Sequence, residues 1–288
     1  MDFLCGEEFI TRVKLCRMDM KIIDLTFETF SSSVSGIENY EQVHPALFSH
    51  YFRYWAERSR FPGCILTRDR LSFHVNLVKD GLRYAERKIT SFGLPLDDIM
   101  VILFTGQNTS NGHAFMNEGR MIVWLPVETY HTPLQAEVFA THEIIHGIHY
   151  LLSPAFMFCT EDERMHTGRQ LISEGIATYI TKQVLGISDG VSLWADYLDG
   201  EKFGVWFEEC SKREKELKKY CLERFSYSGS DVSLFFANDP DDIFSYRAGY
   251  YLGLQFANWF AKQLKSDHDL LCTRRSELEQ AALHFLSV

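Results

Sequence analysis

The sequence lacks the cysteine spacing and the long apolar runs that mark several common protein classes. Its 7 cysteines are scattered without a Cys-x-x-Cys pair, which excludes a disulfide framework and a zinc site built from thiolates. No stretch reaches the ~18 apolar residues of a transmembrane helix, and no basic segment followed by a long apolar run opens the chain. We therefore expect a cytoplasmic protein with no membrane partner and with reduced thiols. The cysteines are Cys5, Cys16, Cys64, Cys159, Cys210, Cys221 and Cys272.

Positive charge is also scarce. The 29 lysines and arginines against 39 aspartates and glutamates give a net charge of −10, which argues against nucleic acid as a partner. Hydrophobic residues make up 46% of the 288 positions and aromatic residues 14%, enough for a sizeable core. A chain of this length predicts one large domain or two small ones.

One stretch carries a recognisable chemical pattern, the run from Thr141 to His146. His142 and His146 are separated by four positions, so on a helix they lie on one face about one turn apart. Both imidazoles can then bind one metal ion, and Glu143 beside them can reach a water molecule at that metal. A zinc ion needs at least three protein ligands, so the pattern requires a third ligand elsewhere.

The neighbouring residues predict a helix around this stretch. Thr132 supplies a capping side chain and Pro133 suits the first helical position. From Leu134 to Leu152 there is no proline, and Gly147 is the only glycine. The helical repeat predicts a core-facing side and, opposite to it, a histidine-bearing side that faces a cleft. The core-facing residues are Ala140, Ile144, Ile148 and Leu151, and the opposite residues are Val138, His142, His146 and His149.

The candidate third ligand is Glu174, within the run Leu171–Ile180. The two motifs together resemble the gluzincin metallopeptidases, in which a glutamate on a later helix completes the zinc site. The Glu-Gly-x-Ala-Thr-Tyr run that begins at Glu174 is similar to the glutamate helix of aminopeptidase N-type enzymes, whereas the chain length is more like the predicted zinc proteases of bacterial genomes. The resemblance covers about Leu134 to Ile180.

This resemblance implies a mostly helical α+β fold with a gluzincin-type, thermolysin-like zincin core and a small sheet that contains antiparallel strands. Residues 1–95 would form a helical N-terminal part, and residues 96–288 the catalytic core with a helical C-terminal half. It also implies one zinc ion per chain, held by His142, His146 and Glu174. Glu143 would act as general base in the hydrolysis of a peptide bond, with a peptide or protein as substrate.

Two further roles follow from the resemblance. Many gluzincins stabilise the oxyanion with a tyrosine or histidine outside the two motifs, and Tyr250 is the first candidate here and Tyr246 the second, with Arg247 and His149 as further possibilities. Thr178 lies one turn after Glu174, where its hydroxyl could orient a ligand histidine or bond its own helix backbone.

Periodicity predicts the remaining elements. The apolar repeat over residues 67–92 predicts a long helix, and the apolar run Ile99–Phe104 predicts a buried strand. Residues 113–125 predict a hairpin, our candidate for one wall of the substrate cleft. Further predictions are a short strand over Ile22–Phe27, a helix over Pro45–Glu57, and a last long helix from Asp241 to about Leu264 that carries Tyr246 and Tyr250 on one face.

Two alternatives to a peptidase stay open. The protein could be a zinc hydrolase of another amide or an ester, or a zinc-binding regulatory or peptide-binding protein without turnover. The presence of Glu143 favours an enzyme, because a purely structural zinc site needs no general base. The stretch Gly112–Glu118 resembles the amine-binding run of gluzincin aminopeptidases only faintly, so the sequence predicts no aminopeptidase activity.

Overall fold

The computed structural model describes residues 20–31, 41–61, 66–229 and 234–288 of the chain. It shows a mostly helical α+β fold with one mixed four-stranded sheet. In chain order, the strands and α-helices are β1 (Lys21–Asp24), α1 (Thr26–Ser31), α3 (Pro45–Tyr54), α4 (Arg68–Phe92), β2 (Ile99–Phe104), β3 (His113–Asn117), β4 (Arg120–Pro126), α5 (Pro133–Leu152), α6 (Glu161–Arg164), α7 (Thr167–Leu185), α8 (Asp189–Trp194), α9 (Gly200–Lys212), α10 (Glu214–Glu223), α11 (Ala248–Ala261), α12 (Asp267–Cys272) and α13 (Arg275–Ser287).

The sheet has the strand order β1-β2-β4-β3, with β1, β2 and β4 parallel and β3 antiparallel to β4. The predicted strand at 99–104 and the predicted hairpin are confirmed. The hairpin turns at Glu118 and Gly119, whose φ angles of 50° and 77° suit a tight two-residue turn. The predicted first strand is too long, because β1 ends at Asp24, whose carboxylate accepts the backbone N–H of Thr26 and begins α1.

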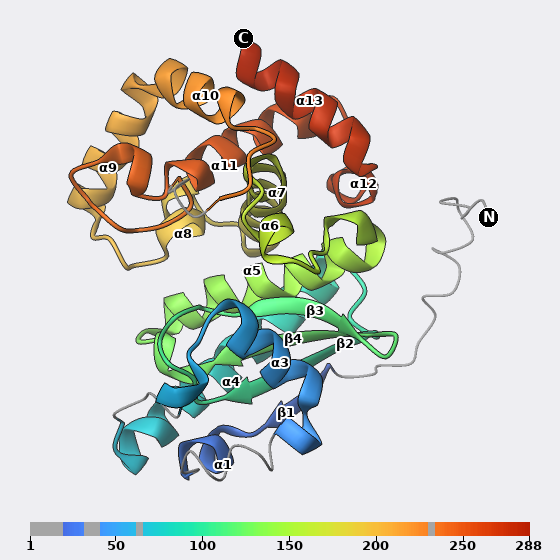
Figure 1. Ribbon diagram of the computed structural model, residues 1–288, viewed down its shortest axis with the longest axis vertical. Helices are drawn as coiled ribbons and strands as arrows, with labels where there is room; N and C mark the ends of the chain where they lie inside the picture. The colour runs from blue at the N-terminus through green and yellow to red at the C-terminus, as the bar shows by residue number, and fades with distance from the viewer. Residues whose placement is uncertain (1–19, 32–40, 62–65, 230–233) are drawn as a thin grey trace.

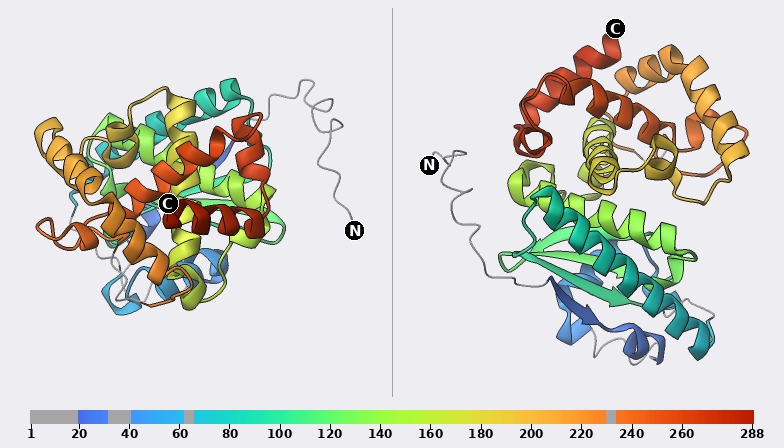
Figure 2. Two further views of the ribbon diagram at one scale, coloured as in Figure 1. Left: turned by 90° about the horizontal axis from the view of Figure 1, so that it is seen from above. Right: turned by 180° about the vertical axis from the view of Figure 1, so that it is seen from behind.

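Helices α4 and α5 cover one face of the sheet (Figure 2, right), and α3 covers the other. The predicted long helix is confirmed as α4, which ends at Gly93 with a φ of 88°. It crosses α5 at Gly81, where an added Cβ would lie 2.8 Å from Ala136. Strand β1 and α4 thus bind elements of residues 96–288 directly, although both come from the predicted N-terminal part.

Helix α5 runs between the sheet and the C-terminal helices (Figure 1). Its cap is as predicted, with Thr132 accepting the N–H of Gln135 and Pro133 in the first turn. The predicted core-facing side is buried, and His146 on the opposite side lines a cavity, as expected of a side that faces a cleft. Helix α7 also packs on this opposite side, so its histidines are buried as well. His149 is completely buried. Gly147 lets α5 approach β4, since a Cβ there would lie 3.1 Å from Val123.

The predicted start of the last long helix, at Asp241, is wrong. Helix α11 begins at Ala248, preceded by a 3₁₀ helix at Ile243–Ser245. Arg247 has a left-handed φ of 58°, which breaks the helical path between the two segments. Tyr246 therefore precedes the helix and does not share a helical face with Tyr250.

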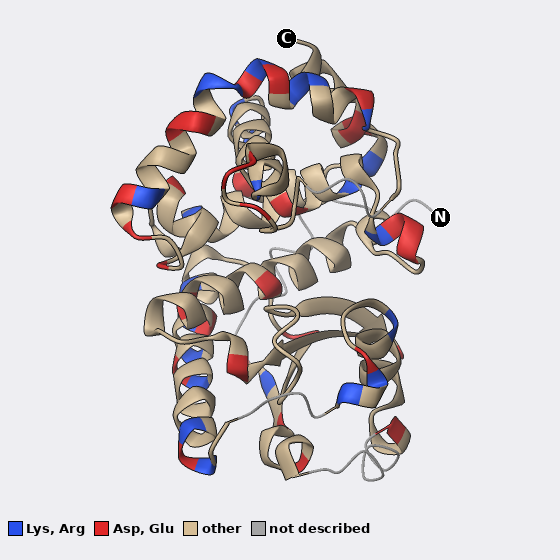
Figure 3. Ribbon diagram, turned by 60° about the vertical axis from the view of Figure 1, so that its left-hand side comes forward, with Lys and Arg blue, Asp and Glu red and all other residues tan. Residues whose placement is uncertain are grey.

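Charged residues of both signs are interspersed along the outer helices (Figure 3). Many form exposed pairs within one helix, such as Lys212 with Glu208. No helix in the described part of the chain has the length and apolar character that crossing a membrane requires. Cys159, Cys210, Cys221 and Cys272 carry thiols, and the other three cysteines lie outside the described residues.

Candidate metal centre

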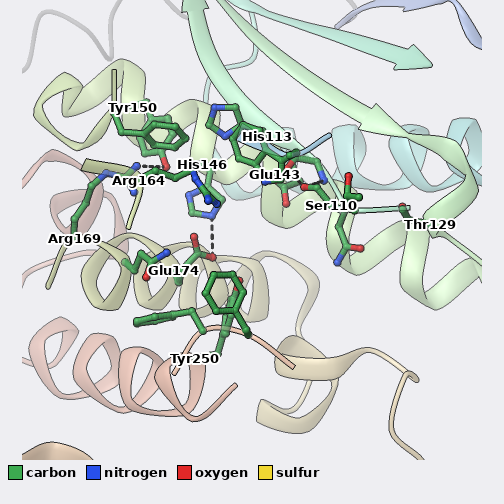
Figure 4. Close-up of a pocket in the computed structure, with 18 of the residues that line it drawn as sticks. Ser110, His113, Thr129, Glu143, His146, Tyr150, Arg164, Arg169, Glu174 and Tyr250 are labelled. Carbon is green, nitrogen blue, oxygen red and sulfur yellow. Dashed lines mark hydrogen bonds and ion pairs between the residues drawn. The ribbon is translucent and has the colours of Figure 1, made fainter. Parts of the chain in front are cut away.

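Three ligand atoms meet between α5 and α7, and Figure 4 shows two of the three residues, His146 and Glu174. The Nε2 atoms of His142 and His146 lie 3.1 Å apart. Glu174 Oε2 lies 3.2 Å from the first and 3.3 Å from the second. The predicted constellation of two histidines and a distant glutamate is therefore present as a buried, nearly equilateral triangle.

The size of this triangle suits a metal ion. A tetrahedral site with bonds of about 2.0–2.1 Å has ligand–ligand separations of about 3.3–3.4 Å, close to the three distances above. Hydrogen bonds alone fit less well, because a single proton between two of these atoms leaves the third facing another lone pair. The residues present therefore fit a cation held by His142, His146 and Glu174.

The charges around the triangle favour the same conclusion. Burial acts to lower the pKa of His146, but Tyr150, Glu174 and Glu143 outweigh it and raise that pKa to about 10. Burial acts to raise the pKa of Glu174, but His146 and His142 hold it well below its usual range. The carboxylate is thus ionised and the surroundings attract one positive charge, which a proton or a metal ion can supply.

Glu143 lies beside the triangle and lines the same cavity as His146 and Glu174. Burial is the main cause that raises the pKa of Glu143 to about 7, with a further contribution from Glu174. Gly112 packs against this side chain, since a Cβ there would lie 2.7 Å from Glu143 Cγ. Glu143 therefore places beside the metal ligands a carboxyl group that can gain or lose a proton near neutral pH.

A chain of polar contacts supports His146 from behind. Its Nδ1 lies 3.3 Å from the hydroxyl of Ser173, which lies 3.2 Å from the hydroxyl of Tyr150. Arg169 donates to that Tyr150 hydroxyl at 3.0 Å. Contacts of this kind orient a ligand imidazole. The sequence analysis did not identify any of these three residues as a support for His146. The position of Ser173, directly before the glutamate ligand, was the one feature that could have indicated this role.

Thr178 is buried on α7, one turn after Glu174. Within the described part of the chain, no hydrogen bond joins its hydroxyl to His142 or His146. Its role in orienting a ligand histidine stays a prediction, whereas Ser173 makes such a contact in the structure.

The candidate oxyanion donors lie in different places. Tyr250 lines the cavity beside Glu174, close enough for the charge of that carboxylate to act on its phenol. Burial, followed by the charge of Glu174, raises the pKa of Tyr250 well above its usual range, so the phenol stays protonated. Tyr246 packs its ring on Trp194, with ring centroids 5.2 Å apart. Arg247 places its guanidinium 4.2 Å from the Tyr250 ring centroid, and His149 packs on Phe156.

The cavity beside the triangle has a volume of about 380 Å³. One wall is the loop 108–112, which the buried carboxylate of Glu128 holds by accepting the N–H groups of Gly106 and Asn108. His113, the first residue of the predicted cleft-wall hairpin, also lines the cavity, and its ring packs against those of Trp55 and Phe158. The cavity thus brings together residues from β3, α5, α7 and α11.

No protein-family model, curated protein or solved structure matches this chain. The similarity to zincins therefore rests on the buried His142/His146/Glu174 triad, which resembles the His-Glu-x-x-His motif with its downstream glutamate.

Proposed function

We propose that the protein is a zinc-dependent hydrolase of peptide bonds. The observation that carries this proposal is that Glu143 borders the same cavity as His146 and Glu174, two of the three corners of the triangle with His142. A structural zinc site is closed by a fourth protein ligand, whereas a catalytic site leaves one position open beside a base. Zinc in this position would polarise the substrate carbonyl and make a nearby water more acidic.

Glu143 would act as the general base. Its carboxylate takes a proton from the attacking water and then passes that proton to the leaving amine. A pKa of about 7 suits both steps, because the group can accept and release a proton near neutral pH. The nearby Gly112 keeps space for this side chain beside the cavity.

Tyr250 would donate a hydrogen bond to the oxyanion that develops on the substrate carbonyl. Its protonated phenol lies in the cavity wall near Glu174, where it would be available to donate to a substrate oxygen. The substrate would be an extended peptide beside β3. This strand lies at the edge of the sheet, where a peptide backbone can add alongside it.

The variant Glu143→Gln tests the proposal, because glutamine keeps the shape of the side chain and removes the base. Cleavage of a peptide library should fall by about 10²-fold or more while zinc content is unchanged. The matched control is Glu137→Gln, which changes a carboxylate on the same helix away from the cavity.

Equal cleavage by the wild type and Glu143→Gln would attribute the activity to a contaminant and contradict the proposal. Zinc and peptide binding without cleavage by either protein would instead support the regulatory alternative.

A further inference from the structure

The cavity contains a buried arginine without an acidic partner. Arg169 is only 3% exposed, and its Nε donates to the carbonyl oxygen of Phe156 at 2.7 Å. Its Nη2 donates to the hydroxyl of Tyr150 at 3.0 Å. Both acceptors are neutral, and no carboxylate of the described residues forms an ion pair with Arg169.

The other arginine in the cavity wall differs in this respect. The guanidinium of Arg164 binds both carboxylate oxygens of Glu161 and lies over the ring of Trp55. Its charge is therefore compensated within the protein. Of the two arginines in the described cavity wall, Arg169 is therefore the one whose charge no carboxylate of the protein balances.

An uncompensated buried charge is costly unless a ligand completes it. A guanidinium cannot lose its proton at physiological pH, so Arg169 cannot neutralise itself. Its planar fork matches a carboxylate, and Nη1 makes no hydrogen bond to any described residue. The rings of Phe158 and Tyr150 flank the guanidinium, with centroids 4.8 Å and 5.8 Å from Cζ, and hold it in place.

Two further residues of the cavity wall have unused hydrogen-bonding atoms. His113 is 7% exposed and its Nε2 has no partner among the described residues, and the same holds for Oε1 of Gln170. Buried polar atoms without partners are uncommon and suggest that a ligand satisfies them. Together with Arg169 they are polar residues of the cavity wall that do not belong to the metal triad.

We propose that this part of the cavity binds a carboxylate of the substrate, with Arg169 as its anchor. The inference rests on the proposed function, because it names the substrate class of the same site. Arg169 connects to His146 through Tyr150 and Ser173, so a carboxylate there would hold a peptide beside the metal centre. The carboxylate could be a free C-terminus or the side chain of an acidic residue.

Binding to the zinc-loaded Glu143→Gln protein tests this without turnover. Three probes are compared by calorimetry: acetylated glycyl-glycyl-phenylalanine as the free acid, its C-terminal amide, and acetylated glycyl-glycyl-glutamate amide. The free acid should bind about 10- to 100-fold more tightly than its amide, the range expected of a hydrogen-bonded charge pair. Tighter binding of the glutamate amide than of the phenylalanine amide would identify the side-chain carboxylate as the group recognised.

Additional substitutions Arg169→Gln and Arg169→Lys separate the arginine from the metal, which also attracts carboxylates. At equal zinc content and native circular dichroism, Arg169→Gln should abolish the acid preference, and Arg169→Lys should retain only part of it. Arg164→Gln should preserve the preference, because that charge is already paired.

Equal affinity of the Glu143→Gln protein for all three probes would overturn the inference, as would an unchanged preference in Arg169→Gln. Acid-selective binding lost in Arg169→Gln, with no cleavage by the wild type, would uphold carboxylate recognition while contradicting the proposed peptidase activity.

Discussion

Gly175 and Gly253 meet backbone to backbone where α7 crosses α11. A Cβ at Gly175 would lie 2.3 Å from the carbonyl oxygen of Gly253, a separation that no side chain can occupy. Glu174 precedes the first glycine, and Tyr250 lies one turn before the second. The close crossing therefore brings a candidate metal ligand and a candidate oxyanion donor to the wall of one cavity.

The variant Gly253→Ala should be destabilised because its Cβ would lie 2.7 Å from the carbonyl oxygen of Leu171. Overpacking of this kind costs about 1–3 kcal/mol, measured as a lower urea midpoint with an unchanged slope. The control is Gly204→Ala in α9, where no atom lies within 4 Å. That exposed helical position should gain roughly 0.5–1 kcal/mol, and equal behaviour of the two variants would contradict the packing argument.

Protein purified without added metal should contain one zinc ion per chain by elemental analysis. His146→Ala should abolish this content, because it removes one corner of the triangle with His142 and Glu174. The exposed His131→Ala should retain it. Full zinc content in a double His142→Ala/His146→Ala variant would exclude the site.

Ser173→Ala should lower zinc affinity by about 10- to 100-fold, because the hydroxyl next to Nδ1 of His146 is lost. The measurement is competition with a chelator of known affinity. Thr178→Val tests the other predicted contact in the same assay. A loss with Thr178→Val but none with Ser173→Ala would reverse the assignment of the residue that orients a histidine.

Tyr250→Phe should lower kcat for peptide cleavage by about 10²-fold with little change in KM, because the phenol acts on the developing oxyanion. Zinc content and the unfolding midpoint should stay near those of the wild type. Tyr246→Phe is the comparison, since its ring packs on Trp194. If Tyr246→Phe alone slows turnover, Tyr250 is not the donor.

His149 should make the fold sensitive to acid. Burial, with the charges of His146 and Arg169, lowers the pKa of His149 from 6.5 to about 3. Between these values the unfolded chain binds a proton that the folded chain excludes, so stability present above pH 6.5 is lost as pH falls toward 3. The loss is about 1.4 kcal/mol per pH unit in this window.

Urea unfolding of the wild type and of His149→Gln across pH 4–7 measures this effect as the difference between two slopes. The free energy of unfolding should depend less steeply on pH in His149→Gln than in the wild type. The exposed His131→Gln variant should have the same pH dependence as the wild type. Identical slopes for the wild type and His149→Gln would show that His149 does not titrate on unfolding.

Local periodicity was sufficient to predict α4, β2, the hairpin and the helix that carries His142 and His146. In each case the pattern repeats within one element, so backbone geometry alone determines which side chains share a face. Glu174 was within reach of the sequence because its motif was recognisable on a second helix. The start of α11 was not, because it depends on the left-handed backbone at Arg247, whose guanidinium lies between Trp194 and Tyr250.

The sequence by itself determined the candidate ligands and the base, because the spacing of His142, Glu143 and His146 on a helix lets all three side chains approach one metal site. Only the tertiary structure decided that Ser173 supports His146, that Tyr250 lines the same cavity as Glu174, and that Arg169 is buried without an acidic partner. These relationships join helices that are distant along the chain. Their separations depend on packing, such as the contact of Gly175 with Gly253, and no local pattern encodes them.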